Sequence, residues 1–152
     1  MTVGKDAVKE LRDRTGVSVM ECKKALEAAK GDMEKALGIL QSQAALVADK
    51  KSTRELGAGV VAAYIHNNVL GAMVSLSSET DFVAKHEEFK KLAQDIAMHV
   101  AATQPESVEV LLQQPYIKDE SKTVKDLLSA ATQKFGERVE VSGMSVLFSS
   151  RK

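Results

Sequence analysis

The sequence has no tryptophan, two prolines and a single cysteine, Cys22. With one thiol, no disulfide forms within the chain, so its stability must come from packing, as is usual in a reducing compartment. No run of apolar residues approaches the roughly 20 needed to span a bilayer, and the first residues lack the apolar stretch of a signal peptide. We therefore expect a cytoplasmic protein of bacterial type, or a protein of an organelle matrix or stroma.

An excess of charge of one sign is also missing. Lysine plus arginine number 21, and aspartate plus glutamate also number 21. A balanced charge gives no general attraction to nucleic acid or to a membrane surface. Aromatic residues make up 4% of the chain, which argues against a stacking surface for single-stranded nucleic acid. We therefore expect no direct nucleic-acid partner and no membrane partner.

The first part of the chain shows helical periodicity. Three short helices are expected in turn, and Ser18 with Glu21 has the pattern of a capping box at the start of the second. Gly31 is expected to end that helix, and Asp32 to cap the third. These patterns predict a compact three-helix domain over residues 1–50.

The second part has a different composition. A polar stretch, residues 49–55, precedes two β-rich runs over 60–66 and 69–76, and Asn67-Asn68 between them suits a tight hairpin turn. Two amphipathic helices and a final strand are expected over residues 87–103, 123–135 and 139–148. The fold class is therefore α+β. Residues 51–152 are predicted to form a small antiparallel sheet core with helices packed on one face.

The last expected strand carries apolar residues in both phases of its alternation. Counted by strict alternation, one face holds Val139, Val141 and Leu147, and the other holds Met144, Val146 and Phe148. Two helices cover only one face of a small sheet, and an uncovered apolar face usually marks an interface. We expect a partner on that face, such as a second copy of the chain.

No catalytic or metal-binding constellation stands out. His66, His86 and His99 lie in three separate elements and have no zinc-motif spacing, so surface or packing roles are favoured by roughly ten to one. Cys22 is in phase with the inner face of its helix, which favours a buried thiol over a nucleophile. No metal, cofactor or enzymatic activity is expected, and a small enzyme is the weakest alternative.

The turn after the second strand, Glu79–Lys85, places Phe82 and Val83 in a polar setting. Thr80 or Asp81 can cap this turn and hold it helical. Physical considerations alone favour, by about two to one, a Phe82 side chain that folds back as a staple against the following helix. If it points outward instead, it is an interface anchor worth roughly 1.5–3 kcal/mol when buried in a partner.

Several segments, in this order, are similar to those of the elongation factor Ts family. They are LRDRTG over Leu11–Gly16, MECKKAL over Met20–Leu26, TDFVAK over Thr80–Lys85 and IAMHVAA over Ile96–Ala102. The similarity continues through Pro115–Asp119 to the final strand and covers nearly the whole chain. It implies a UBA-like three-helix domain, a linker and an α+β core.

The resemblance also implies a function and its residues. Members of the family are guanine-nucleotide exchange factors for the translational GTPase EF-Tu, and bind both its GDP-bound and its nucleotide-free form. In the family, the N-terminal domain docks on the nucleotide-binding domain of EF-Tu. The turn that carries the TDFVAK segment, Glu79–Lys85, is the signature turn of the family and lies beside the nucleotide site. The implied docking residues are Arg12, Val19, Met20 and Lys23, and the implied signature residues are Thr80, Asp81, Phe82 and Val83. Two residues of the long helix, Met98 and His99, are implied as contacts with a more distal domain.

Two further expectations follow from the resemblance. Longer members carry two core repeats and a protruding helical hairpin, whereas this sequence has one core and a short segment, Ser107–Gln114, at the place of the hairpin. Single-core members pair as homodimers, which agrees with the expected uncovered sheet face. The alternative to an exchange factor is a UBA-like binding or adaptor module without exchange activity.

Overall fold

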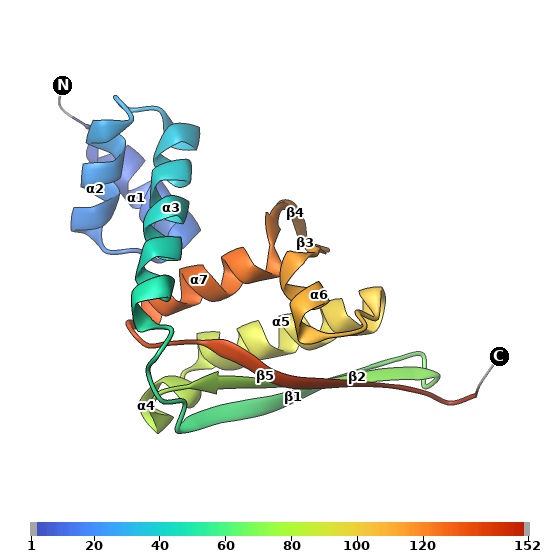
Figure 1. Ribbon diagram of the computed structural model, residues 1–152. Helices are drawn as coiled ribbons and strands as arrows, with labels where there is room; N and C mark the ends of the chain where they lie inside the picture. The colour runs from blue at the N-terminus through green and yellow to red at the C-terminus, as the bar shows by residue number, and fades with distance from the viewer. Residues whose placement is uncertain (1–2, 151–152) are drawn as a thin grey trace.

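The computed structural model describes residues 3–150, drawn in Figure 1. The chain begins with three helices, α1 (Lys5–Thr15), α2 (Val19–Ala28) and α3 (Met33–Lys51). Their inner faces share one apolar cluster that contains fully buried Leu11, Cys22, Leu26 and Ala36. The expected three-helix bundle is therefore present. α3 runs further into the polar stretch than expected, and its last turn carries Lys50 and Lys51, whose charges suit the negative end of a helix dipole.

Side chains cap the second and third helices as expected. The backbone N–H of Glu21 donates to Oγ of Ser18 at 3.3 Å, and the N–H of Lys35 donates to Oδ1 of Asp32 at 3.1 Å. The return half of the expected capping box is replaced by an ion pair, because the Glu21 carboxylate lies 3.7 Å from Nζ of Lys24. These caps fix where α2 begins, and so fix the position of its first turn.

The core of the second part is a three-stranded antiparallel sheet in the order β1-β2-β5. Its strands are β1 (Ala58–His66), β2 (Leu70–Ser78) and β5 (Glu140–Phe148). Asn67 and Asn68 have φ values of 51° and 59°, so the predicted hairpin turn between β1 and β2 is confirmed. A short second hairpin, β3 (Pro115–Tyr116) with β4 (Asp119–Thr123), was not predicted, because neither strand has the apolar alternation of a half-buried strand.

Four helices complete the chain: α4 (Asp81–Ala84), α5 (Glu87–Thr103), α6 (Val108–Gln113) and α7 (Val124–Phe135). The expected bounds of α5 are confirmed, and α7 begins after its cap, Thr123, and ends before left-handed Gly136. Figure 1 shows α5, α6 and α7 on one side of the sheet. The α+β class with helices on one face is therefore confirmed. Among residues 3–150, none of the helices combines the length and the apolar character that a bilayer-spanning segment requires.

The register of β5 differs from the expectation of strict alternation. Leu76 of β2 pairs with Val141, whereas Val74, two residues earlier, pairs with Met144, so β5 holds one extra residue at a bulge. The bulge changes the phase of the strand, and Val141 and Met144 both pack toward the helices. The assignment of Val141 and Leu147 to one face was therefore wrong. Leu147 lies on the opposite face and is 76% exposed.

The face of the sheet away from the helices is uncovered and apolar, as expected, although most of its members come from other strands. In Figure 1, α5, α6 and α7 lie above the sheet, and α4 lies at its left-hand end. The exposed large apolar residues of this outer sheet face are Val61, Ile65, Met73 and Leu147. Gly71 lies between Ile65 and Leu147 in the strand pairing and leaves a hollow of about 210 Å³ beside them.

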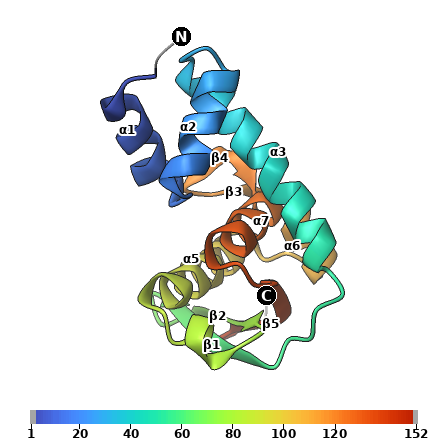
Figure 2. The same ribbon diagram turned by 90° about the vertical axis from the view of Figure 1, so that its left-hand side faces the viewer.

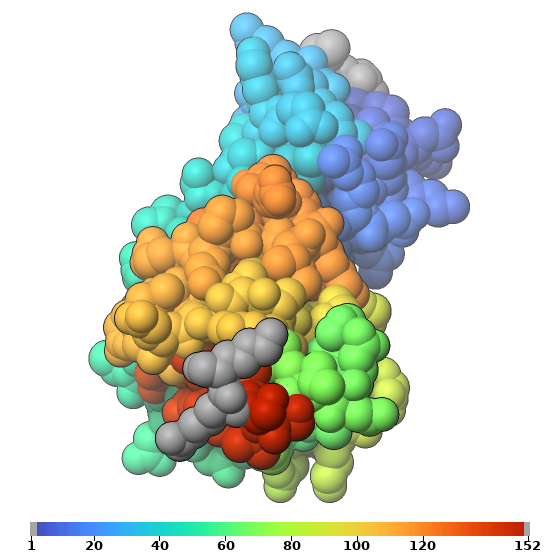
Figure 3. Space-filling view, turned by 90° about the vertical axis from the view of Figure 1, so that its right-hand side faces the viewer, coloured from blue at the N-terminus to red at the C-terminus, as the bar shows by residue number. Residues whose placement is uncertain are grey.

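The two parts of the chain meet where α3 packs along α7, as Figure 2 shows. Gly16, at the end of α1, lies directly against the side chain of Lys134 in α7. Figure 3 shows the segment of α6, β3 and β4, in orange, between the blue and cyan N-terminal helices and the end of the sheet. The N-terminal bundle is therefore held against the core through α7.

Candidate functional site

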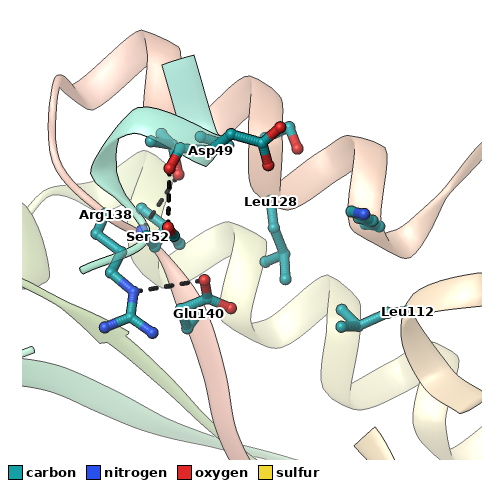
Figure 4. A pocket seen from close by; sticks show the side chains of 11 residues that line it. Asp49, Ser52, Leu112, Leu128, Arg138 and Glu140 are labelled. Carbon is teal, nitrogen blue, oxygen red and sulfur yellow. Dashed lines mark hydrogen bonds and ion pairs between the residues drawn. The ribbon is translucent and has the colours of Figure 1, made fainter. Parts of the chain in front are cut away.

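A hollow of about 200 Å³ lies where the end of α3, α6, α7 and β5 meet (Figure 4). Two contacts join residues of its lining: Nε of Arg138 lies 3.5 Å from Oε1 of Glu140, and Oγ of Ser52 donates to the backbone carbonyl of Asp49 at 2.8 Å. Within residues 3–150, no group of three or more histidine, cysteine, aspartate or glutamate side chains is arranged to hold a metal ion. This hollow therefore gives no indication of a catalytic centre.

The signature turn is the most distinctive surface feature of the core. Phe82, in the four-residue helix α4, is 92% exposed, while Ala84 is buried and Val83 packs against the main core. The expectation that Phe82 folds back as a staple was therefore wrong. Successive helical residues point in directions about 100° apart, so turning Val83 and Ala84 inward leaves Phe82 pointing to solvent. Asp81 beside it is also exposed.

The turn is held by a glutamate from a distant part of the chain. The N–H groups of Glu79 and Thr80 donate to Oε1 of Glu137 at 3.2 and 3.0 Å, and Oγ1 of Thr80 donates to its Oε2 at 2.7 Å. In return, the N–H of Arg138 donates to Oε2 of Glu79 at 2.5 Å. The expected side-chain cap of α4 by Thr80 or Asp81 is absent. The Thr80 hydroxyl bonds the Glu137 carboxylate instead.

Sequence reasoning missed Glu137, because 57 residues separate it from Thr80 and only the pairing of β2 with β5 brings them together. The linker is tied to the same place. Nη1 of Arg54 lies 3.5 Å from Oε1 of Glu79, and Nη1 of Arg138 donates to the carbonyl of Arg54 at 2.8 Å. The turn, the start of β5 and the linker thus meet at one set of hydrogen bonds.

The docking residues implied for the N-terminal domain are all exposed. Val19 and Met20, in the first turn of α2, are 50% and 66% exposed, and Arg12 and Lys23 carry positive charge at exposed positions. In Figure 1, α2 and α4 lie on the same side of the molecule, and Figure 2 shows this side face on.

The two candidate distal contacts differ in exposure. Met98 is half-buried beside a hollow of about 320 Å³ that Tyr64 and Leu70 also line. His99 is fully buried: its Nε2 lies 2.9 Å from Oε1 of Gln114, and its Nδ1 accepts the N–H of Ile117 at 3.2 Å. Burial lowers the pKa of His99, and the bond to Gln114 opposes this only in part. As a correction, the side chain of His99 ties α5 to the β3–β4 region and is not on the surface.

Cys22 is fully buried, as expected, and its thiol lies 3.5 Å from the carbonyl oxygen of Val17. Burial raises the pKa of the Cys22 thiol, while the Thr15 hydroxyl and Arg12 lower it to a smaller extent. A buried thiol with a raised pKa is a poor nucleophile. Cys22 is therefore a packing residue of the bundle.

Comparison with known proteins identifies the family. The family model described as "Elongation factor TS" matches residues 79–151, which include the signature turn and Glu137. Elongation factor Ts of Thermodesulfovibrio yellowstonii is 36% identical, with 93% of this chain and 93% of that protein aligned. Elongation factor Ts of Thermosipho melanesiensis is 39% identical, with 89% and 92% aligned.

A rice protein from Oryza sativa subsp. indica, "Polyprotein of EF-Ts, chloroplastic", is 38% identical over 88% of this chain and 16% of its own length. The alignment with the T. yellowstonii protein spans 185 positions, more than the 152 residues of this chain, so that relative contains inserted residues that this chain lacks. The identity nevertheless extends over almost all of the chain. The chain therefore belongs to the elongation factor Ts family and is a translation elongation factor.

Proposed function

We propose that this chain is a guanine-nucleotide exchange factor for EF-Tu, and that it accelerates the release of GDP during translation elongation. The observation that carries the proposal is the 92% exposure of Phe82 on a turn held by hydrogen bonds to Glu137. A large aromatic side chain that is exposed and yet held in place is suited to insertion into a partner.

In this proposal Asp81 and Phe82 enter beside the nucleotide site of EF-Tu. The GTPase holds Mg²⁺ and the phosphates of GDP with ligands that tolerate little displacement. A wedge of one aromatic ring moves those groups apart and so weakens the hold on both the ion and the nucleotide. The chain itself makes and breaks no covalent bond and needs no cofactor of its own. Thr80 and Val83 act inside the turn, Thr80 through Glu137 and Val83 through the core.

The N-terminal bundle supplies a second contact in this proposal. Val19 and Met20 provide apolar area, and Arg12 and Lys23 provide positive charge beside it. Docking there would hold the chain on EF-Tu both before and after GDP leaves, while the inserted Phe82 favours the nucleotide-free form. Coupling between the chain and GDP is reciprocal: if the chain weakens GDP binding a thousandfold, GDP weakens the binding of the chain by the same factor, about 4 kcal/mol. Met98 remains a candidate for a third, distal contact, and His99 does not.

We also propose that two copies of the chain pair through the outer sheet face. Val61, Ile65, Met73 and Leu147 are each more than half exposed there, and the hollow at Gly71 can receive a side chain of the second copy. A closed symmetric pair would bury this apolar area in both copies at once. It would leave Phe82 and the first turn of α2 free, since neither belongs to this face.

An adaptor role without exchange activity is the second candidate. The observation in its favour is an open, largely apolar groove along α2 and α3, lined by Ala28, Gly38, Ile39 and Leu46 among others. Such a groove on a small helical domain suits a peptide ligand. It does not explain why the chain holds an exposed phenylalanine on the attached core, so we rank it second.

The deciding experiment is release of a fluorescent GDP from EF-Tu, with this chain added at a tenth of the GTPase concentration or less. If a substoichiometric amount of this chain accelerates GDP release from all of the EF-Tu, the chain is an exchange factor, because each copy must act repeatedly. Binding to EF-Tu without acceleration supports the adaptor role. A folded chain that neither binds EF-Tu nor accelerates release would refute the exchange proposal.

A further inference from the structure

We propose that Glu137 is a positioning residue for nucleotide exchange: its carboxylate fixes the two residues before α4, and so fixes the direction in which Phe82 points. The proposal rests on the exchange function proposed above. We refer to Glu79, Thr80, Glu137 and Arg138 as the clamp.

The helix that carries Phe82 is too short to hold its own geometry. α4 has four residues, far fewer than an isolated helix needs, and Thr80 makes no side-chain cap to it. Its backbone bonds are the donations from Ala84 N–H to the carbonyl of Thr80 at 3.2 Å, from Lys85 N–H to that of Asp81 at 2.9 Å and from His86 N–H to that of Val83 at 3.0 Å. Val83 and Ala84 attach α4 to the core, and the orientation of its first turn then depends on what fixes Thr80.

Glu137 holds Glu79 and Thr80 through three hydrogen bonds, one from Glu79 and two from Thr80. One carboxylate accepts two backbone N–H groups and one hydroxyl, at 3.2, 3.0 and 2.7 Å. Hydrogen bonds to a charged acceptor are about twice as strong as neutral ones, and one of the three, from the N–H of Glu79, is partly buried. The N–H of Arg138 donates in the opposite direction to Glu79 at 2.5 Å, so the two segments hold each other reciprocally.

The attachment point lies two residues from the wedge. The carbonyl oxygen of Thr80 starts α4 and also accepts the Ser78 hydroxyl at 3.0 Å, while its N–H and hydroxyl bond Glu137. Freeing the N–H and the hydroxyl would loosen the backbone of Thr80, and the exposed Phe82 ring would then sample a wider range of directions. An aromatic anchor that is ordered before binding loses less conformational entropy on insertion than a mobile one.

The clamp also connects α4, which carries Phe82, to the N-terminal bundle. Glu137 follows α7 after a single left-handed residue, Gly136, and α7 packs along α3 of the N-terminal bundle. On the other side, Arg54 of the linker lies 3.5 Å from the Glu79 carboxylate. Loss of Glu137 should thus impair the insertion step and leave the docking surface on α2 as it is.

The test compares the wild-type chain with Glu137→Ala, Glu137→Gln and Thr80→Val in the GDP-release assay, at increasing EF-Tu·GDP concentration. Glu120→Ala, which removes an exposed glutamate of β4, is the matched control. We expect Glu137→Ala to lower the maximal release rate roughly tenfold, as the loss of charge-assisted bonds implies, with KM changed less than twofold. Glu137→Gln keeps an acceptor for the two N–H groups and Thr80→Val keeps the carboxylate, so both should fall between wild type and Glu137→Ala.

Amide hydrogen exchange gives a readout that does not depend on EF-Tu. The amides of Glu79 and Thr80 should exchange faster in Glu137→Ala than in the wild-type chain, while those of α5 stay protected. If Glu137→Ala fails to fold, Glu137→Gln and Thr80→Val test the positioning role instead, and both should show a lower maximal rate than the wild-type chain. An active wild-type chain whose Glu137 variants keep its maximal rate, or show unchanged Glu79 and Thr80 amides, would overturn the positioning role alone. A wild-type chain that does not accelerate release would overturn the exchange function itself and this inference with it.

Discussion

The backbone N–H of Ile117 donates to Nδ1 of His99 at 3.2 Å, deep under the β3–β4 hairpin. This bond requires a bare Nδ1, so the proton of the neutral ring lies on Nε2, which faces Oε1 of Gln114 at 2.9 Å. The Gln114 oxygen also accepts the Thr103 hydroxyl at 2.9 Å. A second proton on His99 would break the bond to Ile117 and place a charge in a fully buried site.

The stability of the chain should therefore depend on pH through His99. Burial lowers the pKa of His99 in the folded state, whereas the unfolded chain protonates near the ordinary histidine value of about 6.5. The unfolded state then binds more protons below that pH. The contribution of His99 is fully present above about pH 6.5 and is lost as the pH falls below it toward the folded pKa, by at most about 1.4 kcal/mol per pH unit.

Urea unfolding between pH 7.5 and 5 measures this slope. His99→Gln should be less stable than wild type at pH 7.5 and should show a shallower slope, since it has no proton to gain. His66→Gln, at an exposed position of β1, is measured alongside as a control for replacing a histidine elsewhere in the chain. Equal slopes for wild type and His99→Gln would contradict the assignment.

Phe82→Ala should leave the fold intact and slow exchange. The side chain is 92% exposed, so its removal costs the folded state almost no buried area, while a partner that buries it would lose roughly 1.5–3 kcal/mol. We expect the maximal rate of GDP release to fall roughly tenfold or more. Leu46→Ala, at an exposed apolar position of α3, is the control and should accelerate GDP release from EF-Tu as much as the wild-type chain does. A Phe82→Ala chain with full activity would place the wedge elsewhere.

Met20→Ala should give the opposite kinetic pattern. Met20 lies in the first turn of α2 and is 66% exposed, so its removal weakens docking without touching the clamp or Phe82. An interaction made equally before and during nucleotide release changes KM and leaves the maximal rate unchanged. We expect KM for EF-Tu·GDP to rise about fivefold, in line with the loss of one partly buried side chain. Val110→Ala, an exposed position on α6, is the control, and an unchanged KM in Met20→Ala would argue against docking by α2.

Leu147→Glu should separate the proposed dimer. Leu147 is 76% exposed on the outer sheet face, and a carboxylate there would be buried without a partner in a face-to-face pair. Sedimentation at tens of micromolar should show a dimer for the wild-type chain. The dissociation constant of the dimer should be roughly a hundredfold higher for the variant. Val110→Glu adds the same charge outside the sheet and should stay dimeric. A wild-type chain that is monomeric at these concentrations would refute the pairing.

Gly59→Ala should destabilise the core. A Cβ at Gly59 would lie 2.5 Å from the carbonyl oxygen of Leu76 and 3.0 Å from Cα of Ser77, both backbone atoms of the neighbouring strand. Forcing the strands apart should cost about 1–3 kcal/mol of unfolding free energy. Gly143→Ala in β5 is a matched control, because its Cβ would meet nothing within 4 Å. Urea midpoints of the two variants should differ clearly, and equal midpoints would contradict the close approach of β1 and β2.

Much of the architecture follows from local rules. The bundle can be predicted because helical periodicity and short-range caps, such as Ser18 with Glu21 and Asp32 with Lys35, act within a few residues. The hairpin at Asn67-Asn68 and the bounds of α5 follow for the same reason. The signature turn could be identified as a candidate site because its residues are adjacent in the chain.

What the sequence could not determine depends on contacts between distant segments. The bulge in β5 changes which face Val141 occupies, and alternation alone does not reveal an inserted residue. The packing of Val83 and Ala84 against the core turns Phe82 toward solvent. The start of α4 is held by Glu137, which lies 57 residues after Thr80 in the chain. The family resemblance implied His99 as a surface contact, yet its side chain is fully buried and bonds the N–H of Ile117, between β3 and β4. Local propensity thus sets the helices and turns, while strand pairing and helix packing decide which side chains remain at the surface to meet a partner.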